Sequence, residues 1–200
     1  YIASQIVTAL QSVVSREIGP LKPGVITVGA FHSGTKHNII SDRADLQLTV
    51  RANDEETRAQ LLESIERIAV QMGRVHGLPE ELPVTVTVSE GTPVTNNDPE
   101  LARRLNAALV RDLGADVFEP WEQKGMGAED FAYFVAEEYG VPGYYFAVGG
   151  TPPEAFEAEE AGGPPVPSHH SPLFKIAPRE SVTLGTEAMI AAVLDLAPAR

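Results

Sequence analysis

Residues 1–90 carry hydrophobic positions first at helical and then at strand spacing. Apolar residues recur at helical intervals over 6–14, which predicts a helix that ends near Gly19. The stretches 25–28 and 45–51 are rich in β-branched and apolar residues, and the second alternates apolar with polar positions. Each therefore predicts a strand, the second with one buried face.

A second helix is predicted after Asp54, whose side chain suits the N-cap position. Its apolar stripe consists of Leu61, Leu62, Ile65, Ile68, Ala69 and Met72. Gly73 or Gly77 ends this helix, and residues 84–88 alternate as a third strand. The order is therefore α-β-β-α-β. One strand placed before residue 1 would complete the β-α-β-β-α-β order of a ferredoxin-like domain, with two helices on one face of an antiparallel sheet.

The rest of the chain, residues 91–200, predicts a second region of mixed helix and strand, so the fold class is α/β (α+β). In chain order the pattern predicts a linker over 92–97, a helix from Asp98 to about Leu113, a helix over 128–138, a short buried strand over 144–148, a long exposed loop over 149–168 and an amphipathic helix over 180–196. Asp98 suits an N-cap and Pro99 the first helical position.

Composition narrows the classes of partner. The chain has 200 residues, enough for one ordinary domain or two small ones, and its net charge of −13 argues against a nucleic-acid partner. No apolar run approaches the roughly 20 residues that span a bilayer, so we expect a soluble protein with no membrane partner. The absence of Cys excludes disulfides and thiolate metal sites and fits a cytoplasmic location. The chain opens at Tyr1 with neither Met nor a signal-peptide pattern, as if inside a helix, and we expect something upstream to be missing.

Two candidate functional segments belong to the predicted sheet. The segment 31–40 contains a Gly-Thr turn with His and Asn side chains, which could donate to a substrate carbonyl or carboxylate. A plain polar hairpin loop explains this pattern equally well. Arg51, at the end of a predicted strand, could hold a carboxylate through a bidentate fork. An exposed Arg at a sheet edge is the commoner case.

Three further segments combine Gly or His with polar neighbours. Residues 125–131 place two glycines before two carboxylates, which favours either close backbone approach to a ligand or simply an acidic first helical turn. The strand that ends at 149–150 could present backbone groups to a site, and ordinary turn chemistry explains it as well. His169 and His170 include either a metal ligand or only surface residues. No spacing in the chain makes a closed zinc site, so it supplies at most a fragment of one.

Taken in order, these segments resemble the C-terminal half of the aminoacylase, hippurate-hydrolase and indoleacetyl-amino-acid-hydrolase family of di-metal peptidases. The matching motifs are His-Ser-Gly-Thr-x-x-Asn-Ile-Ile (32–40), Leu-x-x-Thr-Val-Arg (46–51), Pro-x-x-Asn-Asp with one additional residue (93–98), Met-Gly-Ala-Glu-Asp-Phe (126–131), Tyr-Phe-x-x-Gly (145–149) and His-Ser-Pro-x-Phe (170–174). Each motif is weak alone, but their ordered set runs nearly end to end. Two departures are Lys36-His37, where small residues are usual, and a longer acidic loop over 153–163.

The resemblance implies a two-part architecture and a metal site shared with residues outside this chain. Residues 1–90 correspond to most of a ferredoxin-like lid that also mediates homodimerisation, with its first strand missing. Residues 91–200 correspond to the C-terminal portion of an α/β zinc-peptidase catalytic domain. His170 aligns with the family's last metal ligand. The longer parent protein that the resemblance implies is expected to hold two divalent ions, zinc, manganese or cobalt.

The resemblance also implies roles for substrate-binding residues. Asn38 resembles a lid Asn that approaches the substrate carbonyl, where it would serve in catalysis and binding. Arg51 is a weaker candidate for holding a substrate carboxylate, and Gly127 belongs to a helix start that lines the site. The expected function is metal-dependent hydrolysis of an amide bond in an N-acyl amino acid or small peptide-like substrate, with the fragment alone inactive. The alternative is a non-enzymatic dimerisation module with a degenerate catalytic remnant.

Overall fold

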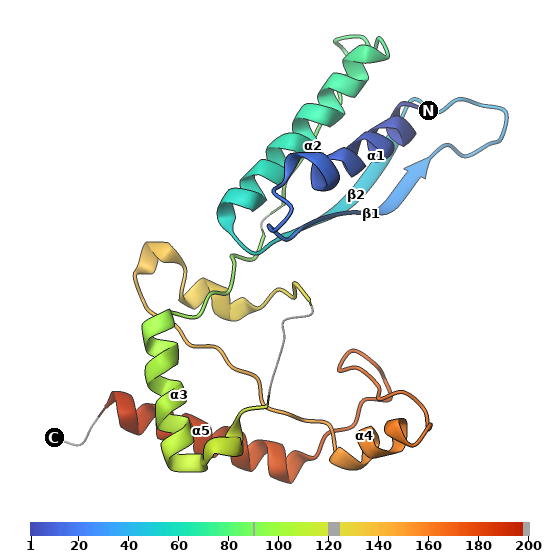
Figure 1. The fold of residues 1–200 in the computed structure, drawn as a ribbon. Coiled ribbons are helices and arrows are strands. Elements are labelled where there is room, and N and C mark those ends of the chain that lie inside the picture. Colours follow the sequence, from blue (N-terminus) through green and yellow to red (C-terminus); the bar gives the residue numbers. More distant parts are fainter. Residues whose placement is uncertain (90, 120–124, 198–200) are drawn as a thin grey trace. The chain divides into compact units, whose positions relative to one another are not determined.

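The computed structural model describes residues 1–89, 91–119 and 125–197 (Figure 1). The chain divides into two compact units by its internal contacts. Unit 1 comprises Tyr1–Thr95 with Gln123–Ala136, and unit 2 comprises Asn96–Glu122 with Glu137–Arg200. No helix among the described residues is long and apolar enough to cross a membrane.

Two helices form one layer of unit 1, as predicted. Helix α1 spans Ile2–Ser12 and continues as the π-helical turn η1, Val13–Glu17. Helix α2 spans Glu55–Val75 and starts at the predicted cap, because the Asp54 carboxylate accepts the backbone N–H of Thr57 at 2.7 Å. This hydrogen bond satisfies a donor that a helix N-terminus leaves unpaired, and it holds the pKa of the Asp54 carboxyl below its usual range.

The two predicted strands form an antiparallel hairpin that is longer than the sequence indicated. Strand β1 spans Gly24–Ser33 and β2 spans Ala44–Ala52. The register shifts between Val28 and Ala30, so β1 carries one extra residue there. Such a bulge bends the strand and increases its twist locally.

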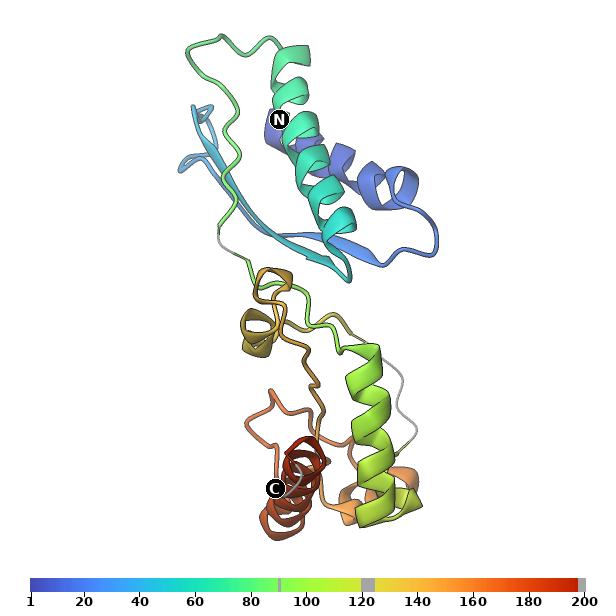
Figure 2. The ribbon, with the colours of Figure 1, turned by 90° about the vertical axis from the view of Figure 1, so that its left-hand side faces the viewer.

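The predicted third strand, 84–88, is wrong as a hydrogen-bonded strand. Among the described residues the sheet has two strands, β1 and β2, and no backbone hydrogen bond joins 84–89 to β2. The segment is extended all the same, and Val84 and Val86 pack against the core at the alternation that the sequence showed. Figure 2 shows it running beside the sheet without joining it. The predicted alternation of apolar residues is therefore present in 84–88. The segment has no neighbouring strand among the described residues that is close enough for backbone hydrogen bonds.

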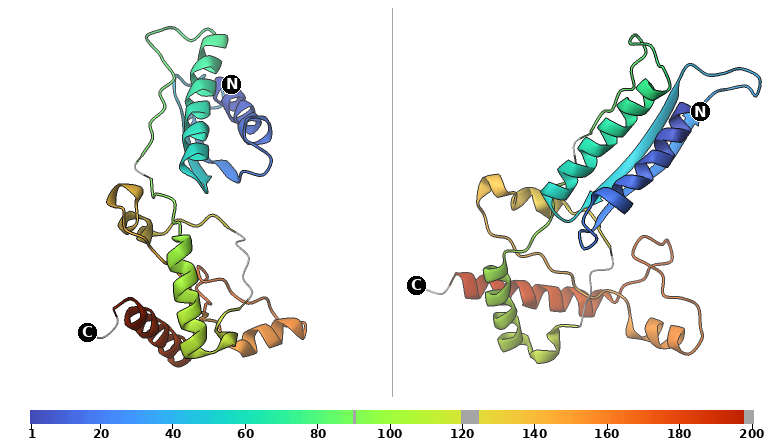
Figure 3. Two further views of the ribbon diagram at one scale, coloured as in Figure 1. Left: turned by 60° about the vertical axis from the view of Figure 1, so that its left-hand side comes forward. Right: turned by 45° about the horizontal axis from the view of Figure 1, so that its top comes forward.

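The core of unit 1 lies between the two helices and one face of the hairpin (Figure 3). Its buried residues are Ile6, Leu10, Val13, Ile18, Leu61, Ile65, Ile68 and Ala69. Apolar residues at every second position of both strands cover it from the sheet side. Glu17 ties η1 to α2 by accepting from Ser64 at 2.8 Å and pairing with Arg67. Arg67 is the main reason that the pKa of the Glu17 carboxyl lies below its usual range.

Unit 2 is built on two long helices that the sequence predicted. Helix α3 spans Pro99–Leu113 and α5 spans Pro178–Leu196. They pack through Leu109, Ala188 and Ala191, and half-buried aromatic residues of 144–148 lie against this cluster. That segment alternates in burial as a strand would, but it pairs with no other strand among the described residues.

Three predicted elements of the second half were wrong, the first being the buried strand over 144–148, which pairs with no strand among the described residues. The expected helix over 128–138 is two short 3₁₀ turns, η3 (Asp130–Phe134) and η4 (Glu137–Tyr139). The Glu129 side chain accepts the N–H of the next residue, and Val135 leaves helical geometry, so no α-helical ladder forms. The expected loop over 149–168 contains helix α4, Pro153–Glu160, because Glu and Ala are strong helix formers. A further 3₁₀ turn, η2, spans Ala115–Val117.

We predict that Leu61→Ala lowers the free energy of unfolding by about 2–5 kcal/mol, because Leu61 is fully buried and its truncation leaves a cavity. Leu21→Ala is the matched control, since Leu21 is 95% exposed, and its effect should stay below about 0.5 kcal/mol. Urea unfolding followed by circular dichroism measures both. Equal losses in the two variants would show that the core of unit 1 is placed wrongly.

Candidate functional site

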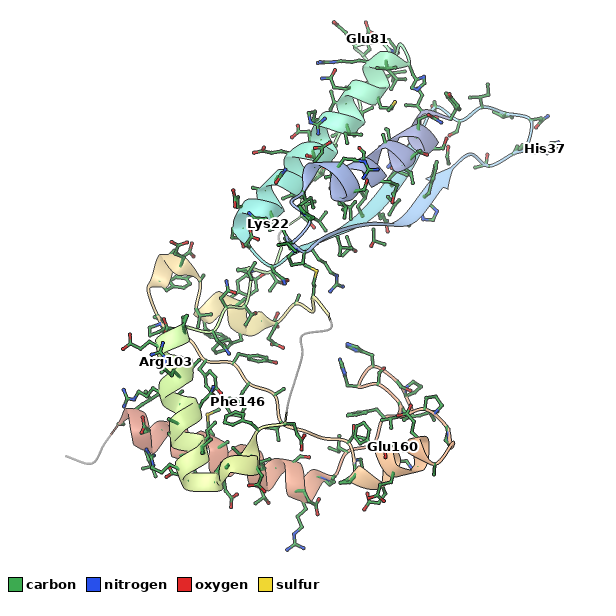
Figure 4. All side chains as sticks on the ribbon, in the orientation of Figure 1. Lys22, His37, Glu81, Arg103, Phe146 and Glu160 are labelled. Carbon is green, nitrogen blue, oxygen red and sulfur yellow. The ribbon has the colours of Figure 1, made fainter. Side chains whose placement is uncertain are left out.

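Asn38 lies in the long loop that joins β1 to β2. All residues of 34–40 are exposed, including Ile40 at 99% (Figure 4 labels the neighbouring His37). The base of the loop is closed by Ser33, whose hydroxyl donates to the Arg43 carbonyl at 2.9 Å. Within the loop, Asn38 is therefore presented to solvent with nothing of its own unit covering it.

The base of this loop is also fixed by an ion pair. The Arg43 guanidinium donates from Nε to both Asp45 carboxylate oxygens, at 2.9 and 2.8 Å. This pairing holds the pKa of the Asp45 carboxyl below its usual range. Because both partners are largely exposed, the pair orders the start of β2 more than it stabilises the unit.

Arg51 and Gly127 lie at the same cleft of unit 1. The Arg51 guanidinium donates through Nη1 to the backbone carbonyl of Met126, so it fixes the segment that contains Gly127. The cleft has a volume of about 560 Å³ and is lined along its length by β2 and by residues 86–89 and 91–95. Two of the substrate-binding candidates therefore meet, although Arg51 already bonds a carbonyl of its own chain.

Asn38 and Arg51 lie at opposite ends of the hairpin. Arg51 pairs with Val25 at the start of β1, whereas the Asn38 loop leaves from Ser33, which pairs with Ala44. Strands rise roughly 3.3 Å per residue, so Ala44 and Arg51 are about 23 Å apart. One small substrate cannot contact Asn38 and Arg51 of the same protomer.

His170 lies in unit 2, in a segment of two successive turns. The N–H of Ser171 donates to the Ser168 carbonyl at 2.8 Å, and the N–H of Phe174 donates to the Ser171 carbonyl at 3.0 Å. His169 and His170 are both exposed, and their ring centroids are 4.3 Å apart. The two rings therefore lie close to each other.

The described residues offer one candidate ligand for a metal ion, His170, and do not form a complete metal site. A neutral imidazole is a good ligand for zinc, cobalt or manganese, and His170 offers one at an exposed turn. Residues 1–89, 91–119 and 125–197 contain no group of three or more His, Asp or Glu that could hold an ion. A complete site therefore requires ligands from elsewhere.

The sequence did not predict the structural role of Asn97. Its side-chain amide bonds the backbone of Tyr145 in both directions, accepting from the N–H at 2.7 Å and donating to the carbonyl at 2.8 Å. The next residue, Asp98, caps α3 by accepting from the N–H of Leu101 at 2.7 Å. The Asn-Asp pair therefore joins α3 to the extended segment 144–148. Two adjacent polar residues before a predicted helix were the only signal for it.

Comparison with known proteins agrees with this arrangement. Residues 1–76 match the family model described as a peptidase dimerisation domain. Amidohydrolase YhaA of Bacillus subtilis is 34% identical over 182 residues, which are 91% of this chain and 42% of that protein. Hippurate hydrolase of Campylobacter jejuni is 32% identical over 134 residues, 67% of this chain and 34% of that enzyme.

Two solved structures are similar over nearly the whole chain. An aminohydrolase from methicillin-resistant Staphylococcus aureus matches with a TM-score of 0.74 and 26% identity, covering 97% of this chain and 45% of that one. A dinuclear metal binding peptidase of Bacillus subtilis matches with a TM-score of 0.67 and 21% identity, covering 98% of this chain and 45% of that one, which supports the fold alone.

The fold and these matches define the class of protein. The chain is related to proteins that are named as amidohydrolases and carboxypeptidases. It belongs to the peptidase family that carries this dimerisation domain, as the sequence motifs indicated. The chain spans less than half the length of these relatives.

We predict that the 200-residue chain binds zinc more weakly than about 1 μM, since a closed site that would bind tightly needs more ligands than His170 and its neighbour. Isothermal titration with zinc, cobalt and manganese measures this, with His170→Ala as the matched variant. Sub-micromolar zinc binding that His170→Ala abolishes would mean that further ligands gather around His170.

Proposed function

We propose that this chain forms part of a metal-dependent amidohydrolase that cleaves the amide bond of an N-acyl amino acid or small peptide-like substrate. The observation that carries the proposal is the conjunction of the dimerisation domain at 1–76 with the His-Ser-Pro-x-Phe turn at 170–174. The name of one relative, hippurate hydrolase, supports the substrate class. Residues 1–90 would be the lid and 91–200 the last part of the catalytic domain.

The proposal implies two divalent metal ions, which when bound would supply Lewis-acid polarisation of an amide carbonyl and a more acidic water. Two observations support a metal: His170 offers an imidazole, and the name of a protein of the same fold states dinuclear metal binding. His170 would hold one ion, as zinc, manganese or cobalt. Its turn is fixed on both sides by backbone hydrogen bonds, so the imidazole would be presented with little loss of freedom.

The chain's own polar groups would then act on the substrate. Asn38, exposed on its loop, would donate to the oxyanion that develops on the carbonyl. Arg51 and Gly127 would lie at the carboxylate end of the substrate. To hold a carboxylate, Arg51 would have to exchange its present bond to the Met126 carbonyl for a substrate oxygen.

The separation within the hairpin supports a homodimer in which Asn38 serves the partner's substrate. Asn38 and Arg51 cannot reach the same small substrate in one protomer, and nothing in unit 1 covers the Asn38 loop. The description of the matching domain as a peptidase dimerisation domain supports pairing through this unit. A cytoplasmic location, expected from the sequence, stays a prediction.

The test is hydrolysis of a panel of N-acyl amino acids by the longer protein and by the 200-residue chain. The proposal expects metal-dependent turnover by the longer protein and none by the chain alone. A longer protein that dimerises, holds metal and hydrolyses no member of the panel or of a matching dipeptide panel would favour the alternative, a non-enzymatic dimerisation module. The absence of three gathered ligands among the described residues is the observation behind that alternative.

In the longer enzyme, we predict that Asn38→Ala lowers kcat by about 10²–10³ while KM changes little, because an oxyanion donor acts mainly in the transition state. Steady-state kinetics on a cleaved N-acyl amino acid measures both constants. Lys36→Ala, at another exposed position of the same loop, is the control. An effect of Asn38→Ala on KM alone would mean that the residue binds substrate without helping its reaction.

In the same enzyme, we predict that His170→Ala removes one of two bound metal ions, whereas His169→Ala leaves metal content nearly unchanged. The two residues are adjacent and equally exposed, so they form a matched pair. Metal analysis by inductively coupled plasma mass spectrometry after dialysis gives the number of ions per subunit. Loss of metal in His169→Ala and not in His170→Ala would reverse the assignment.

A further inference from the structure

The hairpin of β1 and β2 contains one residue that has no partner across the sheet. Val28 lies opposite Leu48 and Ala30 lies opposite Gln47, so Gly29 is the extra residue of the bulge. A bulge interrupts the ladder of backbone hydrogen bonds, bends the strand and increases its twist. The hairpin therefore changes direction at Gly29.

Neither the pairing nor the core requires this extra residue. Without Gly29 the remaining pairs would form a regular ladder, because Val28 and Ala30 already lie opposite consecutive residues of β2. The faces of the strands would also be kept, since Leu46 and Leu48 both pack against the core and are two residues apart. The direction of the strand is thus the feature that Gly29 changes.

The bulge lies where the hairpin leaves the core of unit 1. Ile26 and Val28, which precede it, pack against the buried cluster. Beyond it, Ala30 takes no part in that packing and Phe31 is 44% exposed. The end of β1 is therefore held mainly by its pairing with β2, so its direction depends on the backbone at the bulge.

The loop that carries Asn38 is fixed to this end of the hairpin. The Ser33 hydroxyl donates to the Arg43 carbonyl at 2.9 Å, and the Ser41 hydroxyl donates to the same carbonyl at 2.8 Å. The Arg43 guanidinium is in turn paired with Asp45 at the start of β2. Because these contacts close the base of the loop, a change in the direction of the hairpin end carries over to the loop.

A small change of direction at the bulge is a large displacement at the loop. Ser33 lies four positions after Gly29, which is a lever of about 13 Å at roughly 3.3 Å per residue. A change of about 20°, the size of the twist between neighbouring strands, would move Ser33 by about 4 Å. Figure 4 shows the loop reaching farther out, with His37 near its tip. A catalytic group that is misplaced by about 1 Å can lose about a hundredfold in rate.

We propose that Gly29 is a positioning residue for Asn38. The extra residue in β1 bends the hairpin so that the loop presents Asn38 to the carbonyl of the partner's substrate. The inference rests on the proposed function, in which Asn38 is an oxyanion donor. Bulges are common beside active sites, where they re-aim side chains in this way.

The number of residues at the bulge matters more than the absence of a side chain there. The φ of Gly29 is not in the left-handed region. A Cβ built on Gly29 would have the Gln47 carbonyl oxygen as its nearest neighbour, at 3.9 Å, which is an ordinary contact. Gly29→Ala should therefore keep the bulge, whereas deletion of Gly29 removes it, and the two form a matched pair.

The experiment compares both variants in the longer enzyme on an N-acyl amino acid that it hydrolyses. Deletion of Gly29 should lower kcat by about 10²–10³ with little change in KM, as the loss of an oxyanion donor would. Gly29→Ala should retain most of the activity. Metal content, the dimer and the circular dichroism spectrum should be unchanged in both, because neither variant removes a strand pair or a core residue.

A double variant separates positioning from a merely structural role. Deletion of Gly29 should cause no further loss of kcat in Asn38→Ala, since a donor that is absent cannot be misplaced. Deletion of Ala30 is a second route to the regular ladder, because Gly29 would then lie opposite Gln47. It should have the same effect, and it decides the question if the first deletion does not fold.

Three results would overturn the proposal. Normal kcat in a folded deletion variant, with Asn38→Ala impaired, would mean that the bulge does not position Asn38, and the proposed function would stand. A further loss of kcat in the double variant would mean that the bulge acts on something other than Asn38. Normal kcat in Asn38→Ala would leave no donor to position, and it would count against the proposed role of Asn38 as well.

Discussion

The packing of α1 and α2 on one face of the β1–β2 hairpin is the interaction on which unit 1 depends. It buries Leu10, Val13 and Leu61 almost completely, while the opposite face of the hairpin stays open. Because side chains of a strand alternate between faces, this single core fixes the register of the hairpin. The hairpin in turn decides where its two ends, and the residues on them, can lie.

That geometry sorts the candidate residues. Asn38 belongs to the loop at one end and Arg51 to the other end, so the hairpin acts as a rigid spacer between them. Arg51 holds the Met126 carbonyl and thereby brings Gly127 to the cleft. Asn38 lies too far from Arg51 to act on the same substrate within one protomer. The proposed role of Asn38 as an oxyanion donor therefore depends on the proposed homodimer, in which Asn38 would contact the partner's substrate.

Unit 2 also depends on the packing of two helices, α3 and α5, on an extended segment. α3 and α5 pack on the extended segment 144–148, and Asn97 bonds that segment as a neighbouring strand would. α5 nevertheless keeps large apolar residues exposed, among them Val182 and Leu194 at 66% and 65%. The described residues therefore leave a cleft beside β2 in unit 1 and an exposed apolar face of α5 in unit 2.

The sequence by itself determined the long helices α1, α2, α3 and α5, the hairpin and the resemblance to the family. Periodic apolar residues, the Asp54 and Asp98 caps and the ordered motifs are local signals, and local hydrogen bonds or helical spacing are enough to express them. Only the tertiary structure decided that 84–88 stays outside the sheet, that Arg51 bonds Met126, and that Asn38 and Arg51 lie at opposite ends. These facts depend on which backbone edges meet across long sequence separations, and no residue pattern within one segment encodes such a meeting.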